Sequence, residues 1–223
     1  MTLVAVAHGT RDPQGVASYY QLLAEVRAQR PGTRVELAFL DHAEPGPAEL
    51  LAGLRGTVVL VPLLLSTGFH LQVDLPAVAA AAPHLRTRIA PALGPHPLLA
   101  DALESRLTEA GGPGDAVVLA AAGSTDPAGN ADTARMAELL AARLGRPVAP
   151  GYLCAAAPTP AEAVAALRAA GHRRIAVAPY LMAPGYFARR AERSGGCVTA
   201  APLGAHAELA RLVLARYDQA LDG

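Results

Sequence analysis

Short apolar runs alternate with longer segments of helical periodicity along the chain. The runs consist mostly of Val, Leu and Ala without polar alternation, which is typical of parallel strands buried on both faces. The expected strands are residues 3–7, 34–40, 58–65, 88–92, 116–121, 147–153, 175–181 and 198–202. Intervening segments, such as 16–29 and 131–144, have the spacing of amphipathic helices. This alternation predicts βαβ units with right-handed crossovers.

The chain contains an internal repeat. The pairs of similar segments are 6–13 with 120–127, 59–70 with 176–187, and 94–100 with 204–210. Because the three pairs follow the same order, they indicate two copies of one unit. The predicted fold is therefore α/β: two tandem doubly wound domains, each with a four-stranded parallel sheet, facing each other across a central cleft.

A Gly- and Pro-rich segment lies at the middle of the chain. Residues 111–114 read Gly-Gly-Pro-Gly, which is the composition of a linker. We therefore expect one half-domain over residues 1–112 and a second over residues 113–223.

Composition excludes several classes of protein. Of 223 residues, 52% are hydrophobic and 17% charged, so a sizeable core can form. Nineteen acids balance nineteen bases, and only 4% of residues are aromatic, which argues against a general nucleic-acid binder. Every base is Arg, so the chain has no lysine for a Walker A loop or a Schiff base.

Membrane and secretion signals are not expected. No apolar stretch reaches the roughly 18 residues that a membrane span needs. The first residues lack a basic leader, and two cysteines do not make a disulfide framework. These features predict a cytoplasmic protein with no membrane partner.

Ligands of open parallel sheets bind beyond the carboxyl ends of the strands. In the first half, segments 8–11, 41–42 and 66–70 follow the expected strands directly. His8, Asp41 and His70 should therefore converge.

Two helices are expected to begin with Asp-Pro, at 12–13 and at 126–127. Thr10, Ser124 and Thr125 would lie beside these helix N-termini, which are favourable places for anions. Two such loops suit a ligand that carries several carboxylates.

The two copies differ at the polar candidates. In the second half, Ala122 stands opposite His8, Cys154 opposite Asp41, and Phe187 opposite His70. Residues needed for the fold should survive duplication, whereas site residues need survive in only one copy. We therefore expect the first half to carry the chemistry and the second half to cover the cleft.

Other polar residues leave alternatives open. His42 could be a second ligand beside Asp41 or an exposed side chain. His96 and His206 recur in both copies, which favours a role in the scaffold. Three arginines could form a solvated face or bind carboxylates: Arg189, Arg190 and Arg193.

The motifs at 8–11, 39–45 and 62–70, together with Gly-Ser-Thr-Asp-Pro at 123–127, resemble those of the class II tetrapyrrole chelatases. More narrowly, the chain is similar to the sirohydrochlorin chelatases of siroheme and cobalamin synthesis. The resemblance covers essentially the whole chain. Like the long members of that family, the chain carries both half-domains.

The resemblance implies ATP-independent insertion of a divalent metal into sirohydrochlorin, with release of two protons. Fe²⁺ is the first choice, and Co²⁺ or Ni²⁺ are alternatives; no cofactor is expected to be permanently bound. His8 and His70, assisted by Asp41, would bind the metal and accept protons. The residues expected to contact the tetrapyrrole are Gly9, Thr10, Arg11, Thr67, Gly68, Ser124 and Thr125.

Two rival functions use the same cleft. One is a carrier that binds metal or tetrapyrrole without turnover, and the other is a small bilobal sugar- or anion-binding protein. For the chelatase, a monomer or a weak homodimer is expected.

Overall fold

The computed structural model describes residues 1–68 and 70–222, without the side chain of residue 70. The chain forms two compact units. The first contains Met1–Leu93 together with Ala205–Gly223, and the second contains Gly94–Gly204. Each unit is an α/β fold built on one parallel sheet, as the sequence predicts.

The sheet of the first unit has the order β2-β1-β3-β4. Its strands are β1 (Thr2–Ala7), β2 (Arg34–Phe39), β3 (Gly56–Pro62) and β4 (Leu85–Ile89). All neighbouring strands pair in parallel. Every residue of β1 is buried, which explains the apolar run from Leu3 to Ala7.

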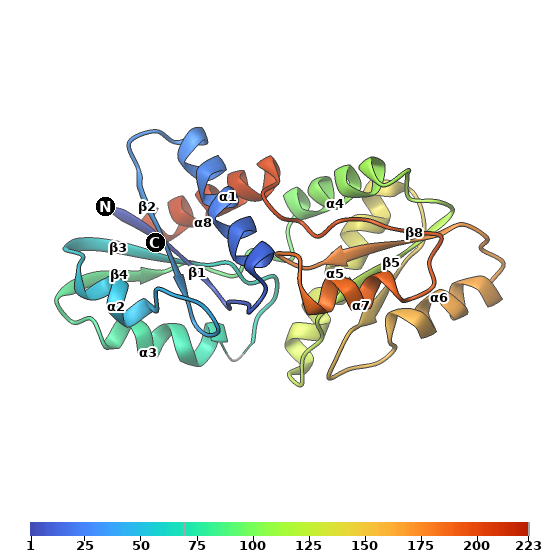
Figure 1. Ribbon diagram of the computed structural model, residues 1–223, viewed down its shortest axis with the longest axis horizontal. Helices are drawn as coiled ribbons and strands as arrows, with labels where there is room; N and C mark the ends of the chain where they lie inside the picture. The colour runs from blue at the N-terminus through green and yellow to red at the C-terminus, as the bar shows by residue number, and fades with distance from the viewer. Residues whose placement is uncertain (69, 223) are drawn as a thin grey trace. The chain divides into compact units, whose positions relative to one another are not determined.

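Helices cover both faces of this sheet (Figure 1). On one face lie α1 (Pro13–Gln29) and α8 (Ala207–Asp222), which pack against each other. The other face carries α2 (Pro47–Ala52), the π-helical turn η1 (His70–Asp74) and α3 (Leu75–Ala80). The core on this second face includes Val4, Val6, Ala38, Leu51, Leu54, Val58, Leu60 and Leu75.

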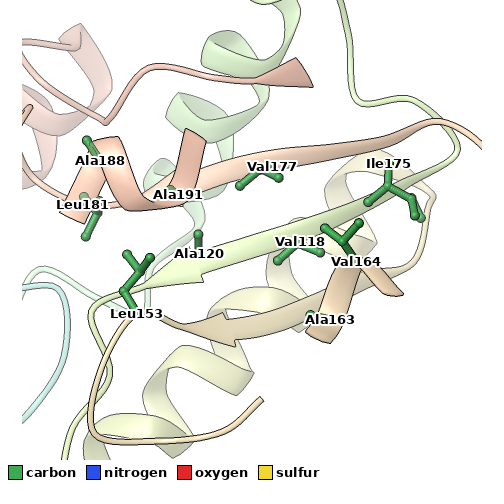
Figure 2. Packing of buried hydrophobic residues seen from close by; sticks show 11 residues of the cluster. Val118, Ala120, Leu153, Ala163, Val164, Ile175, Val177, Leu181, Ala188 and Ala191 are labelled. Atoms are coloured by element: carbon green, nitrogen blue, oxygen red, sulfur yellow. The ribbon is translucent and has the colours of Figure 1, made fainter. Parts of the chain in front are cut away.

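The second unit repeats this plan with the sheet order β6-β5-β7-β8. Its strands are β5 (Ala116–Ala121), β6 (Val148–Tyr152), β7 (Ile175–Tyr180) and β8 (Val198–Thr199). Its helices are α4 (Pro97–Glu109), α5 (Pro127–Leu144), α6 (Pro160–Ala169) and α7 (Tyr186–Glu192). Figure 2 shows one core cluster, in which small side chains of α6 and α7 pack on β5 and β7.

The compact units do not coincide with the expected halves 1–112 and 113–223. Helix α4, at the end of the first half, packs in the second unit, and α8, at the end of the second half, packs in the first unit. Helix α4 packs on α5 and β7, and α8 packs on α1, β3 and β4. A two-pronged ion pair joins α8 to the end of α1: Arg30 Nη1 lies 2.5 Å from Asp218 Oδ1, and Arg30 Nη2 lies 2.6 Å from Asp218 Oδ2. Both of these hydrogen bonds lie within the first unit.

The segment 111–114 is not a boundary between compact units. It lies inside the second unit, where Gly112 N–H donates to Leu107 O and Gly114 forms a β-bridge with Ile175. A Cβ on Gly114 would lie 1.9 Å from the carbonyl oxygen of Arg174. Gly114 is therefore needed for a tight turn of the backbone. The chain passes from one unit to the other at 93–94 and at 204–205.

His96 and His206 follow those two crossings directly. Nδ1 of His96 accepts from Leu98 N–H, and Nδ1 of His206 accepts from Glu208 N–H, each at 3.2 Å. Each imidazole thus caps the start of a helix. This supports the scaffold role expected from their recurrence.

Strand β4 begins three residues earlier than expected. The sequence analysis placed it at 88–92, but the strand spans Leu85–Ile89. Arg86 and Arg88 are exposed, while Leu85 is buried and Ile89 half-buried. This edge strand has one solvent-facing side and therefore alternates in polarity, so a search for continuous apolar runs misplaces it.

None of the described helices is long and apolar enough to span a membrane. Cys154 and Cys197 are both exposed and form no disulfide.

Candidate functional site

Strand pairing brings His8 and Asp41 together at the carboxyl edge of the first sheet. The β1–β2 ladder continues past the strand ends, where Leu40 N–H donates to Ala7 O at 2.9 Å and Asp41 N–H donates to His8 O at 2.8 Å. The backbones of these two residues therefore lie side by side, and the convergence of their side chains stays a prediction. Their position follows from backbone pairing and needs no side-chain contact.

The loop after β3 reaches the same edge. Leu63 N–H donates to Val6 O at 2.8 Å, which holds the start of this loop against β1. Thr67 and Gly68 are half-buried, and Gly68 O accepts from the N–H groups of Leu71 and Gln72. His70 opens the turn η1, but its side chain lies outside the described residues. Its approach to His8 stays a prediction.

Gly9 is required by the close approach of two backbone segments. Its φ is +103°, and a Cβ there would lie 1.7 Å from Asp41 O. Gly123 repeats this arrangement in the second unit, with φ +89° and a Cβ position 2.0 Å from Cys154 O. Because both units share this close backbone approach, packing is enough to explain the glycine at each position. A contact of Gly9 with a tetrapyrrole is untested.

Gly68 has a different environment. A Cβ on Gly68 would meet no described atom within 4 Å. Among the described atoms, a methyl group on Gly68 would therefore have no close neighbour.

His42 lies next to both His8 and Asp41. Its Nδ1 lies 3.1 Å from Asp41 Oδ1, and its backbone N–H donates to the same oxygen at 2.7 Å. The rings of His8 and His42 have centroids 6.0 Å apart and are tilted by 49°. The His42 side chain is 33% exposed, against 60% for Asp41. His42 is thus an exposed residue, as one of the two alternatives expects, and it also lies beside the candidate residues His8 and Asp41.

A pocket of about 370 Å³ opens beside this loop. Its lining is Phe39, Leu40, Asp41, His42, Ala43, Glu44, Gly46 and Pro47. Phe39 forms its buried base and is held by α1, because the rings of Tyr19 and Tyr20 meet it edge-on. Burial raises the pKa of Tyr19 to about 12, so this phenol stays neutral.

Carboxylates already cap both helix N-termini that were expected to bind anions. Asp12 accepts from Gln14 N–H at 3.0 Å, and Asp126 accepts from Ala128 N–H at 2.9 Å. The helices do begin at Pro13 and Pro127, as predicted. Because a negative charge occupies each end, less of the helix dipole remains for a ligand.

The loops before these helices have matching hydrogen bonds. Thr10 Oγ1 accepts from Asp12 N–H at 3.1 Å, and Ser124 Oγ accepts from Asp126 N–H at 3.0 Å. Ser124 N–H also donates to the side chain of Asn130. The hydroxyl protons of Thr10 and Ser124 are the donors that these contacts leave for a ligand. Arg11 and Thr125 are exposed beside them.

In the second unit, apolar packing replaces the candidate site. Ala122 and Phe187, the counterparts of His8 and His70, both pack against the cluster shown in Figure 2. Cys154, the counterpart of Asp41, is exposed. This difference supports the prediction that the chemistry belongs to the first half.

Two tyrosines stand near the strand ends of the second unit. Burial raises the pKa of Tyr152 and that of Tyr180, and Asp132 raises the latter further. Both phenols therefore stay protonated at neutral pH and do not replace imidazole as proton acceptors.

The arginine group lies at the end of α7. Arg190 stacks over the Tyr186 ring at 5.8 Å, and Tyr186 is 65% exposed. Arg189 and Arg193 are exposed as well. This surface combines an aromatic face with positive charge.

Across residues 1–68 and 70–222, no group of three or more His, Cys, Asp and Glu side chains is arranged to hold a metal. The described residues include two neighbouring imidazoles, of His8 and His42, with the carboxylate of Asp41 beside His42. Sequence reasoning left His42 undecided because the turn that directs its ring toward His8 has no apolar pattern. Its positive φ of 64°, shared with Ala155 in the second unit, is visible only in the structure.

Comparison with known proteins identifies the family. The CbiX family model matches residues 2–110 and again residues 116–220. The two matches cover nearly the whole chain, and each corresponds to one copy of the repeat. This confirms that the chain consists of two related halves.

Curated relatives include proteins named for two metals. The chain is 24% identical to a sirohydrochlorin cobaltochelatase of Priestia megaterium, over 86% of this chain and 67% of the relative. It is 26% identical to a sirohydrochlorin ferrochelatase of the same organism, over 81% of this chain and 72% of the relative. A sirohydrochlorin cobaltochelatase of Methanococcoides burtonii is 25% identical over 48% of this chain and 94% of that protein.

Solved structures share the fold. The sirohydrochlorin chelatase SirB of Bacillus subtilis, in complex with cobalt, matches with a TM-score of 0.80 at 22% identity. That match covers 100% of this chain and 96% of SirB. A CbiX structure from denitrifying bacteria matches with a TM-score of 0.73 at 22% identity and covers 99% of each chain. The expected chelatase fold is confirmed, and the family-model matches over both halves show that the chain belongs to the CbiX family.

Proposed function

We propose that this chain is a sirohydrochlorin chelatase, which inserts a divalent metal into the macrocycle with release of two protons and without ATP. Fe²⁺ is the preferred metal, and the product is then siroheme. Co²⁺ insertion for cobalamin synthesis is the alternative, since curated relatives carry both names. The metal is a substrate of this reaction.

The observation that carries the proposal is the pairing of His8 with Asp41 at the carboxyl edge of the first sheet. Metal insertion replaces two pyrrole N–H protons, so groups that accept protons near neutral pH are required. Imidazole, with an ordinary pKa of ~6.5, meets this requirement. His8 accepts one proton from the macrocycle in this proposal, and His70 accepts the other.

Delivery of a metal requires a weak site. Neutral imidazole nitrogens bind Fe²⁺, Co²⁺ and Ni²⁺, but a closed set of four protein ligands would retain the ion. An open site of His8, His70 and Asp41 leaves coordination positions for the pyrrole nitrogens. The metal can then pass to the macrocycle as the protons leave.

Substrate binding uses the loops around this site. Sirohydrochlorin carries eight carboxylates, which suit hydroxyl, backbone and guanidinium donors. On the first half these are supplied by Gly9, Thr10, Arg11, Thr67 and Gly68. Because helix N-termini are already capped by Asp12 and Asp126, the hydroxyl groups and Arg11 contribute most of the attraction.

The second half contributes binding and enclosure in this proposal. Ser124 and Thr125 keep hydroxyl donors, whereas the imidazole and carboxylate positions hold Ala122 and Cys154. Arg189, Arg190 and Arg193 add positive charge. A cytoplasmic location and a monomeric or weakly dimeric state remain predictions.

The test is an anaerobic insertion assay with metal-free sirohydrochlorin and Fe²⁺, Co²⁺ or Ni²⁺, followed by absorbance. A chelatase converts many equivalents of substrate per protein, faster than the spontaneous reaction. A carrier binds one equivalent without turnover, which would reject the proposal. Comparing kcat/KM among the three metals determines the preferred ion.

A further inference from the structure

We infer that His42 is a metal ligand that pairs with His8 to receive the incoming divalent ion, and that Asp41 orients the His42 ring. This inference rests on the proposed function for its biological meaning. It gives the site a third imidazole besides His8 and His70. It also changes the expected role of Asp41 from ligand to positioning residue.

The spacing of the rings fits one shared ion. With roughly 2.1 Å between a metal and each imidazole nitrogen, two rings on one ion have centroids roughly 4.5–6.5 Å apart. The centroids of His8 and His42 are 6.0 Å apart, and their planes are tilted by 49°. The two rings are therefore close enough for one ion to bind both.

Asp41 stands where a carboxylate orients a metal-binding histidine. Its Oδ1 lies 3.1 Å from Nδ1 of His42 and also accepts the His42 backbone N–H at 2.7 Å. A proton on Nδ1 shared with this carboxylate leaves the lone pair on Nε2 for a metal. Such carboxylate–histidine–metal arrangements fix the ring and increase its basicity.

Backbone requirements do not explain the choice of histidine at this position. His42 has a φ of 64°, and His is among the residues enriched in such conformations. However, its counterpart Ala155 has a φ of 58° in the same turn of the second unit. The scaffold thus accepts alanine, and the imidazole is an addition found only beside His8.

The location suits capture of an ion from solvent. The His42 side chain is 33% exposed and lines the pocket of about 370 Å³ beside β2. A two-nitrogen pair binds a divalent ion weakly enough to release it. The ion can therefore dock at His8 and His42 before it passes to the macrocycle.

The experiment titrates the metal-free full-length protein with Co²⁺ alone, without tetrapyrrole, and follows visible absorption. We expect His42→Ala to raise the Kd for Co²⁺ at least about tenfold, and Asp41→Asn to raise it by a smaller factor. His42→Phe keeps a ring against His8 but has no ligand nitrogen, so it should lose as much affinity as His42→Ala. His84→Ala is the control, because His84 lies at the opposite end of the sheet and contacts Leu51 O.

Circular dichroism of each variant verifies that it is folded. In the insertion assay, His42→Ala should raise the KM for the metal and leave the KM for sirohydrochlorin unchanged. The inference is overturned if folded His42→Ala or His42→Phe binds Co²⁺ as the wild type does, or if the wild type binds no Co²⁺.

The two proposals fail in different ways. Co²⁺ binding that depends on His42 without any insertion would reject the chelatase function and keep the metal site. Efficient insertion together with a Kd for Co²⁺ that does not change in the His42 variants would support the function and reject the metal site.

Discussion

Gly9 and Asp41 approach so closely that a Cβ atom on Gly9 would lie 1.7 Å from the Asp41 carbonyl oxygen. The same backbone hydrogen bond that links β1 to β2 beyond their ends, from Asp41 N–H to His8 O, holds the two segments at this distance. The position of the candidate carboxylate therefore depends on the absence of a side chain at Gly9.

Gly9→Ala should destabilise the first unit severely. The substitution combines a positive φ of +103° with overlap against backbone, which together cost roughly 2–4 kcal/mol. Denaturant unfolding followed by circular dichroism measures the loss.

Gly68→Ala is the matched control. Its Cβ meets no described atom within 4 Å, so its free energy of unfolding should stay within about 0.5 kcal/mol of wild type. Equal stability of the two variants would contradict the packing role of Gly9.

The ion pair between Arg30 and Asp218 should stabilise the first unit in a pH-dependent way. The hydrogen bond from Arg30 lowers the pKa of Asp218 below its ordinary value of 3.8. The ionised carboxylate therefore stabilises the folded state above that value, and the contribution disappears as pH falls through the lowered pKa. Since both side chains are more than a third exposed, we expect under about 1 kcal/mol.

Thermal unfolding of Asp218→Asn tests this linkage. At pH 7 the variant should have a Tm lower by up to a few degrees, and the difference should vanish near about pH 2. Asp222→Asn removes a charge from the same helix without touching that ion pair. A Tm difference that persists unchanged at low pH would show that the carboxylate charge is not responsible.

Ser124→Asp tests the contribution of the second half to substrate binding. An added carboxylate should repel the carboxylates of sirohydrochlorin and raise KM roughly five- to tenfold, with a smaller effect on kcat. Ala142→Asp adds the same charge near the far end of α5, beyond about one Debye length, and should leave KM unchanged. An unchanged KM for Ser124→Asp would remove this residue from the binding surface.

The sequence predicted the parallel sheets, the duplication and the position of His8 and Asp41 at one edge of the first sheet, because buried strands and Asp-Pro helix starts have strong local signals. It did not predict that α4 and α8 each pack in the compact unit of the other half, since this exchange depends on packing between segments far apart in the chain. The sequence also did not decide whether His42 is a ligand or an exposed side chain. The ring position depends on a left-handed turn that no hydrophobic period reveals.

The most direct test of the proposed function compares metal insertion by the wild type, His8→Ala and His70→Ala under identical anaerobic conditions. The wild type should turn over many times, and each variant should fall to the spontaneous rate while keeping its fold, because side chains at the sheet edge carry little of the core. The control His84→Ala should retain activity. A wild-type rate equal to the spontaneous reaction, or near-normal kcat in either His8→Ala or His70→Ala, would contradict this account.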